Sequence, residues 1–469
     1  MADWLRTFWL LINQWNDTLK YFYEEQNEMV VREMNPIQVG LLGAGTVGGG
    51  VFTVLNRNHE EIERRAGRGI EISMVADLDA KRAQEIVKGR ATIVSDAYAV
   101  IQDPNIEVVI ELIGGYGIAK ELVLAAIAQG KHVVTANKAL IAVHGNEIFA
   151  AARDRGVIVA FEAAVAGGIP IIKALREGLT ANRIEWIAGI INGTTNFILS
   201  EMRDKGLDFD VVLKQAQELG YAEADPTFDI EGIDAAHKAA IMSAIAFGVP
   251  VQFDKAHIEG ITQLAPIDIR YAEELGYRIK LLGITKRTSH GIELRVHPTL
   301  IPANRLIASV EGAMNAVQVF GDAVGTTLYY GKGAGAEPTA SAVIADLVDV
   351  VRYQSVDPDK RVPYLAFQED RVINTVVMPM GEITTSYYLR LKVADQTGVL
   401  ASITKILAEQ DISIDALLQK EALQGQSQTD LIILSHQTQE KKMLIAIEKI
   451  EQLSTTLGPV IKIRLEELS

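Results

Sequence analysis

The sequence predicts an α/β protein in three parts: a doubly wound parallel sheet, an α+β domain and a small C-terminal βαββαβ module. Three observations lead to this prediction. Short apolar strands alternate with helical stretches over about 120 residues near the start of the chain, which is typical of a parallel sheet. A glycine-rich turn joins the first strand to the first helix. A polar segment with two prolines, "DPDKRVPYLAFQEDR" (357–371), precedes a compact strand and helix pattern.

The composition is that of a globular protein. The chain has 469 residues, 48% of them hydrophobic and 22% charged, and this length allows about three domains. The net charge of −15 argues against a nucleic-acid backbone or an anionic membrane as partner. Because the chain has no cysteine, it has no disulfide, thiolate metal site or cysteine nucleophile, and we expect it in the reducing cytoplasm.

Residues 1–33 form an N-terminal extension. They hold three of the four tryptophans, but their longest apolar run, "FWLLI", is too short to span a bilayer, and they lack the features of a secretory signal. Two interpretations stay open: the extension is an amphipathic helix, or translation starts at Met34 and the preceding residues are misannotated. We expect no transmembrane segment elsewhere in the chain.

The order of elements predicts the domain boundaries. We place a first domain at residues 34–156 and expect paired strands, a glycine loop and a helix within about 315–355 to complete it. Residues 157–314 mix strands and helices and form the α+β domain. A linker at 356–380 leads to the C-terminal module at 381–469, which we expect to be a domain of its own.

The segment "IQVGLLGAGTVGGGVFTVL" (37–55) combines a buried strand, a glycine turn and a helix in a dinucleotide-binding pattern. Gly43 permits the tight turn, Gly45 lets the backbone approach a pyrophosphate, and Gly48 allows helix and strand to pack closely. Free N–H groups at the start of the helix favour phosphate there. We therefore expect a Rossmann-type domain in which NADP(H) or NAD(H) is bound by Gly43, Gly45, Thr46, Val47 and Gly48.

The residues expected near the adenosine ribose do not decide between NAD and NADP. Asp77 ends the second predicted strand, within "GIEISMVADLD" (69–79), in the place of an acidic residue that binds the ribose 2′-hydroxyl of NAD. Lys81 and Arg82 follow it and would suit the 2′-phosphate of NADP. The sequence leaves both cofactors open.

The run "GYAEADPTFDIEGIDAAHK" (220–238) brings five carboxylates before one lysine. A calcium loop in this register needs a glutamate at the position of Lys238, so calcium binding is excluded. A solvated acidic loop is the plainer interpretation. If the carboxylates line a pocket instead, they favour a substrate with an ammonium group, such as an amino acid. Backbone N–H groups of "NGTTN" (192–196), or Lys138, would then bind the α-carboxylate of that substrate.

Two lysines are candidates for the proton donor that a carbonyl-reducing nicotinamide enzyme requires. Lys138 closes "VVTANK" at the carboxyl edge of the predicted sheet, where ligands bind. Lys238 follows Asp234 by four residues, on one face of a predicted helix. The carboxylate either holds this lysine protonated and aimed at a substrate, or the two form a surface salt bridge worth about 0.3–0.5 kcal/mol. The spacing does not decide between them.

A third stretch, "FEAAVAGGIP" (161–170), follows a strand and contains a glycine turn. Glu162 with neighbouring carbonyl groups would suit a small cation. A close-packed turn explains the same residues without one, and the residues alone favour it.

Taken in order, six segments resemble the homoserine dehydrogenase family in its long bacterial form with a C-terminal ACT regulatory domain. They are "GLLGAGTVG", "TANK", "FEAAVAGGIP", "NGTTNFIL", "LGYAEADPTFDIEGIDAAHK" and "GKGAGAEPTA". The resemblance covers residues 34 to about 465. It implies reversible reduction of L-aspartate 4-semialdehyde to L-homoserine by NAD(P)H, on the route to threonine, isoleucine and methionine.

The resemblance also implies roles for the site residues. Lys238 corresponds to the catalytic lysine, usually the proton donor, and Lys138 to a lysine of the nicotinamide and substrate region. Which of the two delivers the proton stays open. Substrate-binding carboxylates of the family correspond to Glu223, Asp229 and Asp234.

Further positions correspond to the cofactor and cation sites. Gly220 and the glycine loop at 333–335, with Gly335, lie where the backbone borders the cofactor. Ala76 stands where many members have an arginine suited to NADPH, so strict NADPH preference is in doubt. A sodium ion is implied at Glu162 and the carbonyl groups of Val165, Gly167 and Ile169.

The C-terminal module resembles an ACT domain, a ferredoxin-like βαββαβ fold, through "VADQTGVLASITKILAEQDISI" (393–414). Asp395 and Gly398 lie at the turn where such domains bind an amino acid, and L-threonine is the expected effector. A module that serves only dimerisation is the alternative. The resemblance also implies a homodimer or homotetramer, with residues 157–314 as the catalytic and dimerisation domain.

Two rival functions are weaker. Aspartate-semialdehyde dehydrogenase forms a thioester on a cysteine, which this chain lacks. An amino-acid sensor with a relic dinucleotide fold would have no use for the combination of Lys138, Asp234 and Lys238.

Overall fold

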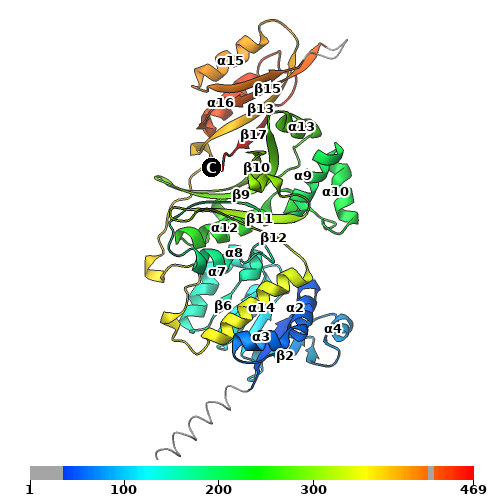
Figure 1. Cartoon of the computed structure of the whole chain (residues 1–469), viewed down its shortest axis with the longest axis vertical. Helices are drawn as coiled ribbons and strands as arrows, with labels where there is room; N and C mark the ends of the chain where they lie inside the picture. Colours follow the sequence, from blue (N-terminus) through cyan, green and yellow to red (C-terminus); the bar gives the residue numbers. More distant parts are fainter. Residues whose placement is uncertain (1–34, 421–426, 469) are drawn as a thin grey trace, which may run out of the picture.

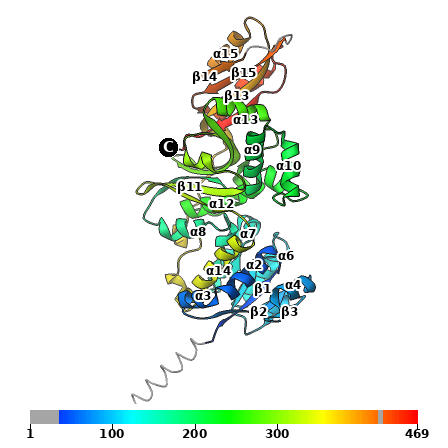
Figure 2. The ribbon, with the colours of Figure 1, turned by 45° about the vertical axis from the view of Figure 1, so that its right-hand side comes forward.

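The computed structural model describes residues 35–420 and 427–468, and the predicted extension at 1–33 lies outside them. Three parts follow one another along the long axis of the molecule, with the first sheet at one end and the C-terminal module at the other (Figure 1, Figure 2). No helix within these two ranges is both long and apolar enough to cross a bilayer.

The first part is a sheet of six parallel strands in the order β3-β2-β1-β4-β5-β6, which confirms the predicted doubly wound fold. The strand order reverses between β1 and β4, and open α/β sheets bind ligands at such a reversal. Its strands are β1 (Ile37–Leu42), β2 (Ile70–Ala76), β3 (Thr92–Val94), β4 (Val108–Glu111), β5 (His132–Thr135) and β6 (Val159–Ala160). Its helices are α2 (Thr46–Arg57), α3 (His59–Ala66), α4 (Ala80–Val87), α5 (Ala97–Gln102), α6 (Ile118–Ala128) and α7 (Lys138–Asp154).

Helix α14 (Ala336–Tyr353) comes from a later part of the chain and packs on α2 (Figure 1). Glycine allows the contact, because a Cβ atom on Gly50 would lie 2.4 Å from the carbonyl oxygen of Ala336. The preceding hairpin, β11 (Met314–Gly321) and β12 (Gly325–Lys332), pairs with a strand of the second part instead. The expectation that 315–355 completes the first domain is therefore wrong for the hairpin and applies to α14 alone.

The second part is a sheet in which the strands run β12-β11-β7-β9-β10, with β8 paired to β10. Helix α12 (Ile233–Phe247) lies on this sheet, and every residue from Asp234 to Phe247 is buried. Polar side chains on such a helix need partners inside the protein. The other elements are β7 (Ile184–Ile190), β8 (His257–Ile258), β9 (Tyr277–Thr288), β10 (Gly291–Pro302), α8 (Ile171–Lys173), α9 (Gly193–Lys205), α10 (Phe209–Glu218), α11 (Thr227–Ile230) and α13 (Pro266–Glu274).

The third part has the predicted βαββαβ order, with its sheet arranged β17-β13-β15-β14 and two helices on one face. This confirms the ferredoxin-like fold. Its elements are β13 (Thr384–Ala394), α15 (Val399–Glu409), β14 (Ile414–Gln419), β15 (Gln428–Ser435), β16 (Thr438–Gln439), α16 (Glu440–Glu451) and β17 (Ile461–Leu465).

The last strand joins the third part to the second. β17 pairs in parallel with β10, with Arg464 opposite Thr299, so the two parts share one continuous sheet. Arg464 is only 1% exposed, and its guanidinium forms ion pairs of 2.7 Å with Glu259 and Glu440. The C-terminal module has a hydrophobic core of its own, as expected of a separate domain, and a shared sheet and a buried ionic cluster also attach it to the second part.

The linker is bound to both neighbouring parts. The Arg361 guanidinium donates hydrogen bonds to three carbonyl groups, including that of Gly156 at 2.8 Å. Further along, the N–H of Ile373 donates to the carbonyl of Gly248 at 2.9 Å. The linker therefore lies along the side of the molecule as an ordered strap between α14 and β13 (Figure 1).

Candidate active site

The glycine turn lies at the strand-order reversal of the first sheet. Gly43 has a φ of +96°, and a Cβ atom there would lie 2.9 Å from the carbonyl oxygen of Leu112. A Cβ on Gly48 would lie 2.2 Å from the carbonyl oxygen of Gly43, whereas one on Gly45 meets nothing within 4 Å. The turn therefore packs tightly at its ends and borders open space in the middle. Thr46 and Val47 follow in the first turn of α2, whose N–H groups suit a pyrophosphate.

Asp77 directly follows β2, as predicted, and its carboxylate supports the glycine turn. Its carboxylate is buried and accepts hydrogen bonds from the N–H groups of Ala44 (2.6 Å) and Asp79 (2.8 Å). The Arg82 guanidinium adds contacts of 3.0 and 3.1 Å to the two oxygens. A carboxylate has about four acceptor positions, and these contacts use them all. Asp77 therefore holds the glycine turn in place and has no acceptor left for a ribose hydroxyl while Arg82 stays paired.

The ends of β4 and β5 carry a polar network that sequence reasoning missed. Glu111 is fully buried, and its carboxylate accepts from the N–H groups of Ile113 and Gly114 and from the hydroxyl of Thr135. Asn137 caps α7 by accepting from the N–H of Leu140 at 3.1 Å. The signal available was a glutamate ending an apolar strand in "VVIE" and an asparagine just before Lys138. The network fixes the loop and the helix start that present Lys138.

Two lysines meet on one carboxylate at the boundary between the first and second parts. Lys138 Nζ lies 2.9 Å from Asp234 Oδ1, and Lys238 Nζ lies 2.6 Å from Asp234 Oδ2. Lys238 also donates to the carbonyl of Ile191 at 2.7 Å. The side chains of Asp234 and Lys238 are only 3% and 10% exposed, which excludes a surface salt bridge. The Lys138 side chain is 37% exposed and faces the open side.

The protein shifts the pKa values of these lysines in opposite directions. The negative charge of Asp234 raises the pKa of Lys138 despite partial burial. Burial lowers the pKa of Lys238, and the positive charge of Lys138 adds to this, although Asp234 opposes both. Against the effect of burial, the two lysines hold the pKa of Asp234 well below its usual range. Lys238 is therefore closer to releasing its proton than an ordinary lysine, which suits a group that exchanges a proton with a substrate.

A second carboxylate stands beside the first. Asn192 Nδ2 lies 2.7 Å from Asp229 Oδ1 and 2.9 Å from Asp234 Oδ2. Burial raises the pKa of Asp229, and the nearby charge of Asp234 raises it further, while Asn192 and Lys238 lower it. The Thr194 hydroxyl has one hydrogen, and its carbonyl partner on Tyr221 (2.7 Å) is closer than Asp229 (3.2 Å). Asp229 therefore keeps an oxygen with acceptor capacity for a cation.

The structure brings together four of the five charged residues that the sequence pointed to: Lys138, Asp229, Asp234 and Lys238. Glu223 is exposed on the loop after α10, and its charge contributes to the raised pKa of Lys138. Gly220, with a φ of +75°, begins the same loop. Phe228 lies on α11 with its ring centroid 5.9 Å from Lys138 Nζ. The solvated-loop interpretation fits Glu223 but not Asp229 or Asp234.

Glu162 is buried and forms no ion pair within residues 35–420 and 427–468. Its carboxylate accepts from the N–H groups of Ile172 (2.9 Å) and Lys173 (2.8 Å), and its residue is 1% exposed. The ammonium of Lys173 pairs with Asp346 and Asp349 instead. Burial, assisted by the charge of Asp346, raises the pKa of Glu162 to about 8. A buried carboxylate in this state fits a small cation.

The backbone around Glu162 is tightly folded. Ala166 and Gly167 have φ values of +56° and +52°, and a Cβ on Gly167 would lie 2.4 Å from the carbonyl oxygen of Gly333. The glycine loop at 333–335, which ends at Gly335 with a φ of +124°, therefore lies against this segment and leads into α14. Across the part of the chain that the structure describes, no group of three or more acidic, histidine or cysteine side chains could hold a metal ion. Any cation here would depend on Glu162 and carbonyl groups such as those of Val165, Gly167 and Ile169.

The predicted effector residues lie between β13 and α15, in the C-terminal module at the end of the molecule opposite the first sheet (Figure 1). Asp395 and Gly398 are both exposed, and Gly398, with a φ of +90°, opens α15. They form the predicted strand-to-helix turn.

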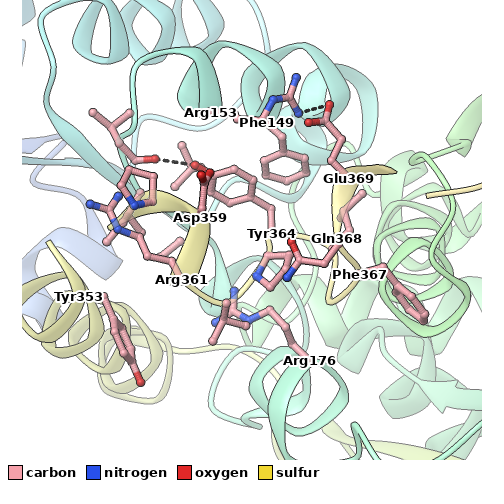
Figure 3. A pocket seen from close by; sticks show the side chains of 18 of the residues that line it. Phe149, Arg153, Arg176, Tyr353, Asp359, Arg361, Tyr364, Phe367, Gln368 and Glu369 are labelled. Atoms are coloured by element: carbon pink, nitrogen blue, oxygen red, sulfur yellow. Dashed lines mark hydrogen bonds and ion pairs between the residues drawn. The ribbon is translucent and has the colours of Figure 1, made fainter. Parts of the chain in front are cut away.

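A separate cavity of about 290 Å³ lies between the linker and the first part (Figure 3). Its lining includes residues 156–160, at the amino end of β6, whereas Lys138 follows the carboxyl end of β5 in the same parallel sheet. The cavity is therefore remote from the lysine pair. Its three arginines are already engaged: Arg153 with Glu369, Arg176 with Glu177, and Arg361 with carbonyl groups.

Comparisons with known proteins agree with this arrangement. Residues 43–162 match the family profile of the homoserine dehydrogenase NAD binding domain, residues 170–348 that of homoserine dehydrogenase, and residues 387–455 that of the ACT domain. Homoserine dehydrogenase from Pseudomonas aeruginosa is 60% identical over 437 residues, covering 93% of this chain and 100% of that protein. The Neisseria gonorrhoeae enzyme is 58% identical over 435 residues, covering 93% and 100%.

Solved structures agree as well. A crystal structure of a homoserine dehydrogenase from Thiobacillus denitrificans matches with a TM-score of 0.89 and 65% identity, over 93% of this chain and 99% of that chain. Relatives of such high identity are matched along their whole length, and the glycine turn and the two lysines on the buried Asp234 are in place. The chain therefore belongs to the homoserine dehydrogenase family, NAD(P)-dependent oxidoreductases that here carry a C-terminal ACT domain.

Proposed function

We propose that the protein reversibly reduces L-aspartate 4-semialdehyde to L-homoserine with a nicotinamide cofactor. The observation that carries the proposal is the buried carboxylate of Asp234, which binds the ammonium groups of Lys138 and Lys238 at the boundary between the dinucleotide-binding sheet and the second part. We assign the product to the route to threonine, isoleucine and methionine, which the family resemblance supports. The cysteine-free sequence supports a cytoplasmic enzyme.

Lys238 is the residue that exchanges a proton with the substrate oxygen in this proposal. Bound NAD(P)H supplies the hydride, which adds to the aldehyde carbon and is released again in the reverse direction. As the carbonyl oxygen gains negative charge, Lys238 Nζ gives it a proton and becomes a neutral amine. The lowered pKa of Lys238 supports this role, since the neutral form is accessible without loss of its bonds to Asp234 and Ile191.

The neighbouring charges bind the two ends of the amino-acid portion. Asp229 keeps acceptor capacity and faces the lysines, so we assign it with Asp234 and the exposed Glu223 to the α-ammonium group. Lys138 keeps a raised pKa and stays charged, which suits the α-carboxylate or the amide of the nicotinamide ring. The pyrophosphate is assigned to the turn from Gly43 to Gly48, and the remaining cofactor contacts to Gly220 and Gly335.

A sodium ion is assigned to Glu162 with the carbonyl groups of Val165, Gly167 and Ile169. The buried carboxylate with a raised pKa supports a cation there. The ion would neutralise Glu162 and stiffen the turn that contacts the 333–335 loop, without taking part in proton transfer.

The choice of cofactor is assigned to the end of β2. The Arg82 guanidinium pairs with Asp77 and neutralises its charge. An incoming ribose would therefore meet the positive side chains of Arg82 and Lys81. We therefore propose that NADP(H) is accepted and that NAD(H) is also used when Arg82 turns aside.

The ACT domain is assigned to regulation by an amino acid, with L-threonine as the first candidate at the turn of Asp395 and Gly398. A homodimer or homotetramer is also proposed. It is supported by the position of β12 at the edge of its sheet in the described part of the chain and by exposed apolar residues near it, Val324 and Tyr330 at 49% and 59%.

The test is an absorbance assay at the nicotinamide band with purified protein, L-homoserine, and NADP or NAD. We expect cofactor reduction that depends on homoserine, with L-serine and L-threonine as substrate controls. A second series adds L-threonine as an inhibitor to wild type and to Asp395→Ala. No homoserine-dependent reduction of either cofactor would refute the function, and unchanged activity with threonine would refute only the regulation.

A further inference from the structure

We propose that Asn192 is a positioning residue of the reaction: its side-chain amide joins two neighbouring carboxylates and so fixes the one that aligns both lysines. The inference rests on the proposed function and adds a residue to it.

Asn192 stands where the second part meets the acidic segment. It follows β7 and caps α9, and only 4% of the residue is exposed. Its Nδ2 atom lies 2.7 Å from Asp229 Oδ1 and 2.9 Å from Asp234 Oδ2. One amide group thus spans α11 and α12, the two helices that carry these carboxylates.

The orientation of the amide follows from its partners. Asn192 Oδ1 accepts the backbone N–H of Thr195 at 2.8 Å, so this end must be the oxygen. The two carboxylate oxygens at the other end accept only, so that end must be the NH₂ group, and its two hydrogens serve one carboxylate each. A flipped amide would lose all three hydrogen bonds.

The bridge counters a repulsion that the site requires. Two carboxylates beside each other repel, and burial strengthens the effect. Asp234 is held by both lysines, but Asp229 has no lysine within ion-pair distance among the residues that the structure describes. A neutral donor between the two keeps both carboxylates close without adding a positive charge that would compete with a substrate ammonium group.

The bridge also directs Lys238. Asp234 Oδ2 accepts from both Asn192 and Lys238, and the residue next to Asn192, Ile191, supplies the second acceptor of Lys238 at 2.7 Å. If the amide is lost, the two lysine side chains alone hold the Asp234 carboxylate, and any shift of the carboxylate moves the Lys238 ammonium with it. Reactions between groups held in place are sensitive to such displacements.

Two variants separate this role from helix capping. Asn192→Ser keeps a good N-cap for α9 but is too short to reach either carboxylate. Asn192→Asp also keeps the cap and the shape, but replaces the donor by a third negative charge. The control is Asn146→Ser, which removes an exposed amide, outside the site, that bonds only to the backbone of Val251.

The assay measures reduction of L-aspartate 4-semialdehyde by NADPH against pH. In this direction, the fall of kcat/KM at low pH (the low-pH limb of the pH profile) reports a carboxylate that must be ionised to bind the substrate ammonium. Removing the Asn192 donor raises the pKa of Asp229 further, so the limb moves to higher pH. The groups that face Asp229 and share in this titration are Asn192, Thr194, Asp234 and Lys238, with Lys138 and Glu223 beyond them.

We expect kcat/KM of Asn192→Ser to fall about 10- to 100-fold, as for the loss of one or two hydrogen bonds to charged groups. Asn192→Asp should fall further. Both should bind NADPH as wild type does, and Asn146→Ser should keep the wild-type limb. The inference is overturned if Asn192→Ser keeps kcat/KM within about twofold and its limb at the wild-type pH, or if Asn146→Ser moves the limb equally. If wild type fails to act on the semialdehyde, the proposed function is wrong instead.

Discussion

Replacing Asp234 by asparagine removes the charge that both lysines share and leaves the shape of the side chain. Lys238 Nζ lies 2.6 Å from this carboxylate, and its side chain is only 10% exposed. Unit charges about 3 Å apart attract by about 5 kcal/mol at an effective dielectric constant of about 20. Once this attraction is gone, burial and the charge of Lys138 both favour the neutral form of Lys238.

The sign of the effect follows from this change. Reduction of the aldehyde needs protonated Lys238, so activity is lost as pH rises through its pKa. Asp234 raises that pKa, so in Asp234→Asn the high-pH limb moves to lower pH. At neutral pH we expect kcat/KM to fall on the order of 10²- to 10⁴-fold, the usual contribution of a general acid. The free energy of unfolding of Asp234→Asn should be about 1–3 kcal/mol lower than that of wild type, which is the penalty for an unsatisfied buried group.

The assay is the NADPH-dependent reduction followed from acidic to alkaline pH, together with thermal unfolding. Asp268→Asn is the matched control, because Asp268 is fully buried and pairs with Arg390 at 2.6 Å, at the junction with the ACT domain. It should lose stability but keep the wild-type limb. If the high-pH limb of Asp234→Asn stays in place or moves to higher pH, the electrostatic reasoning about the lysine pair is wrong.

Three further predictions concern the parts around this centre. Gly45→Val should unfold at the wild-type temperature but lose NADPH binding, because its side chain enters the open space beside the turn. Gly48→Ala should also unfold at a lower temperature, because its Cβ would lie 2.2 Å from the carbonyl oxygen of Gly43. Equal unfolding temperatures of the two variants would contradict this. The raised pKa of Glu162 means that the native state binds its proton more tightly, so stability falls as pH rises from 4.5 to 8. Above that range, sodium should raise the unfolding temperature of wild type relative to tetramethylammonium but leave Glu162→Gln unchanged, and an equal response would argue against the cation site. Arg464→Met should lower the unfolding free energy by about 3–5 kcal/mol, because the buried Glu440 keeps only Lys462 as a cationic partner and Glu259 loses its ion pair with the guanidinium. Deletion of 380–469 should yield insoluble protein because β10 loses its pairing with β17; a soluble, active truncation would contradict the shared sheet.

Local pattern was enough to predict the doubly wound sheet and the ferredoxin-like module. The spacing of Asp234 and Lys238 on one helical face also predicted their pairing, because four residues make about one turn. Their burial was not predictable, since it depends on how α12 lies against β9 and α7. The same holds for the parallel pairing of Thr299 with Arg464, which joins segments far apart in the chain and makes the ACT domain continuous with the second part.

Two features of the site could not be predicted from the sequence, for a common reason. Asp77 stands in the expected place at the end of β2, but the N–H of Ala44 and the Arg82 side chain occupy its acceptors, and no motif reports such contacts. The sequence suggested backbone N–H groups at "NGTTN", whereas the structure draws attention to the Asn192 side chain. An asparagine before a helix predicts a cap. Its second set of partners, on two other helices, is visible only in three dimensions.

The central claim is that Lys238 exchanges the proton with the substrate oxygen. Its most direct test is the turnover of Lys238→Met, a variant that keeps much of the side-chain volume and leaves Asp234 paired with Lys138. The account predicts that kcat falls on the order of 10²- to 10⁴-fold while NADPH binds with wild-type affinity. Near-normal turnover in a folded, NADPH-binding Lys238→Met protein would contradict the claim.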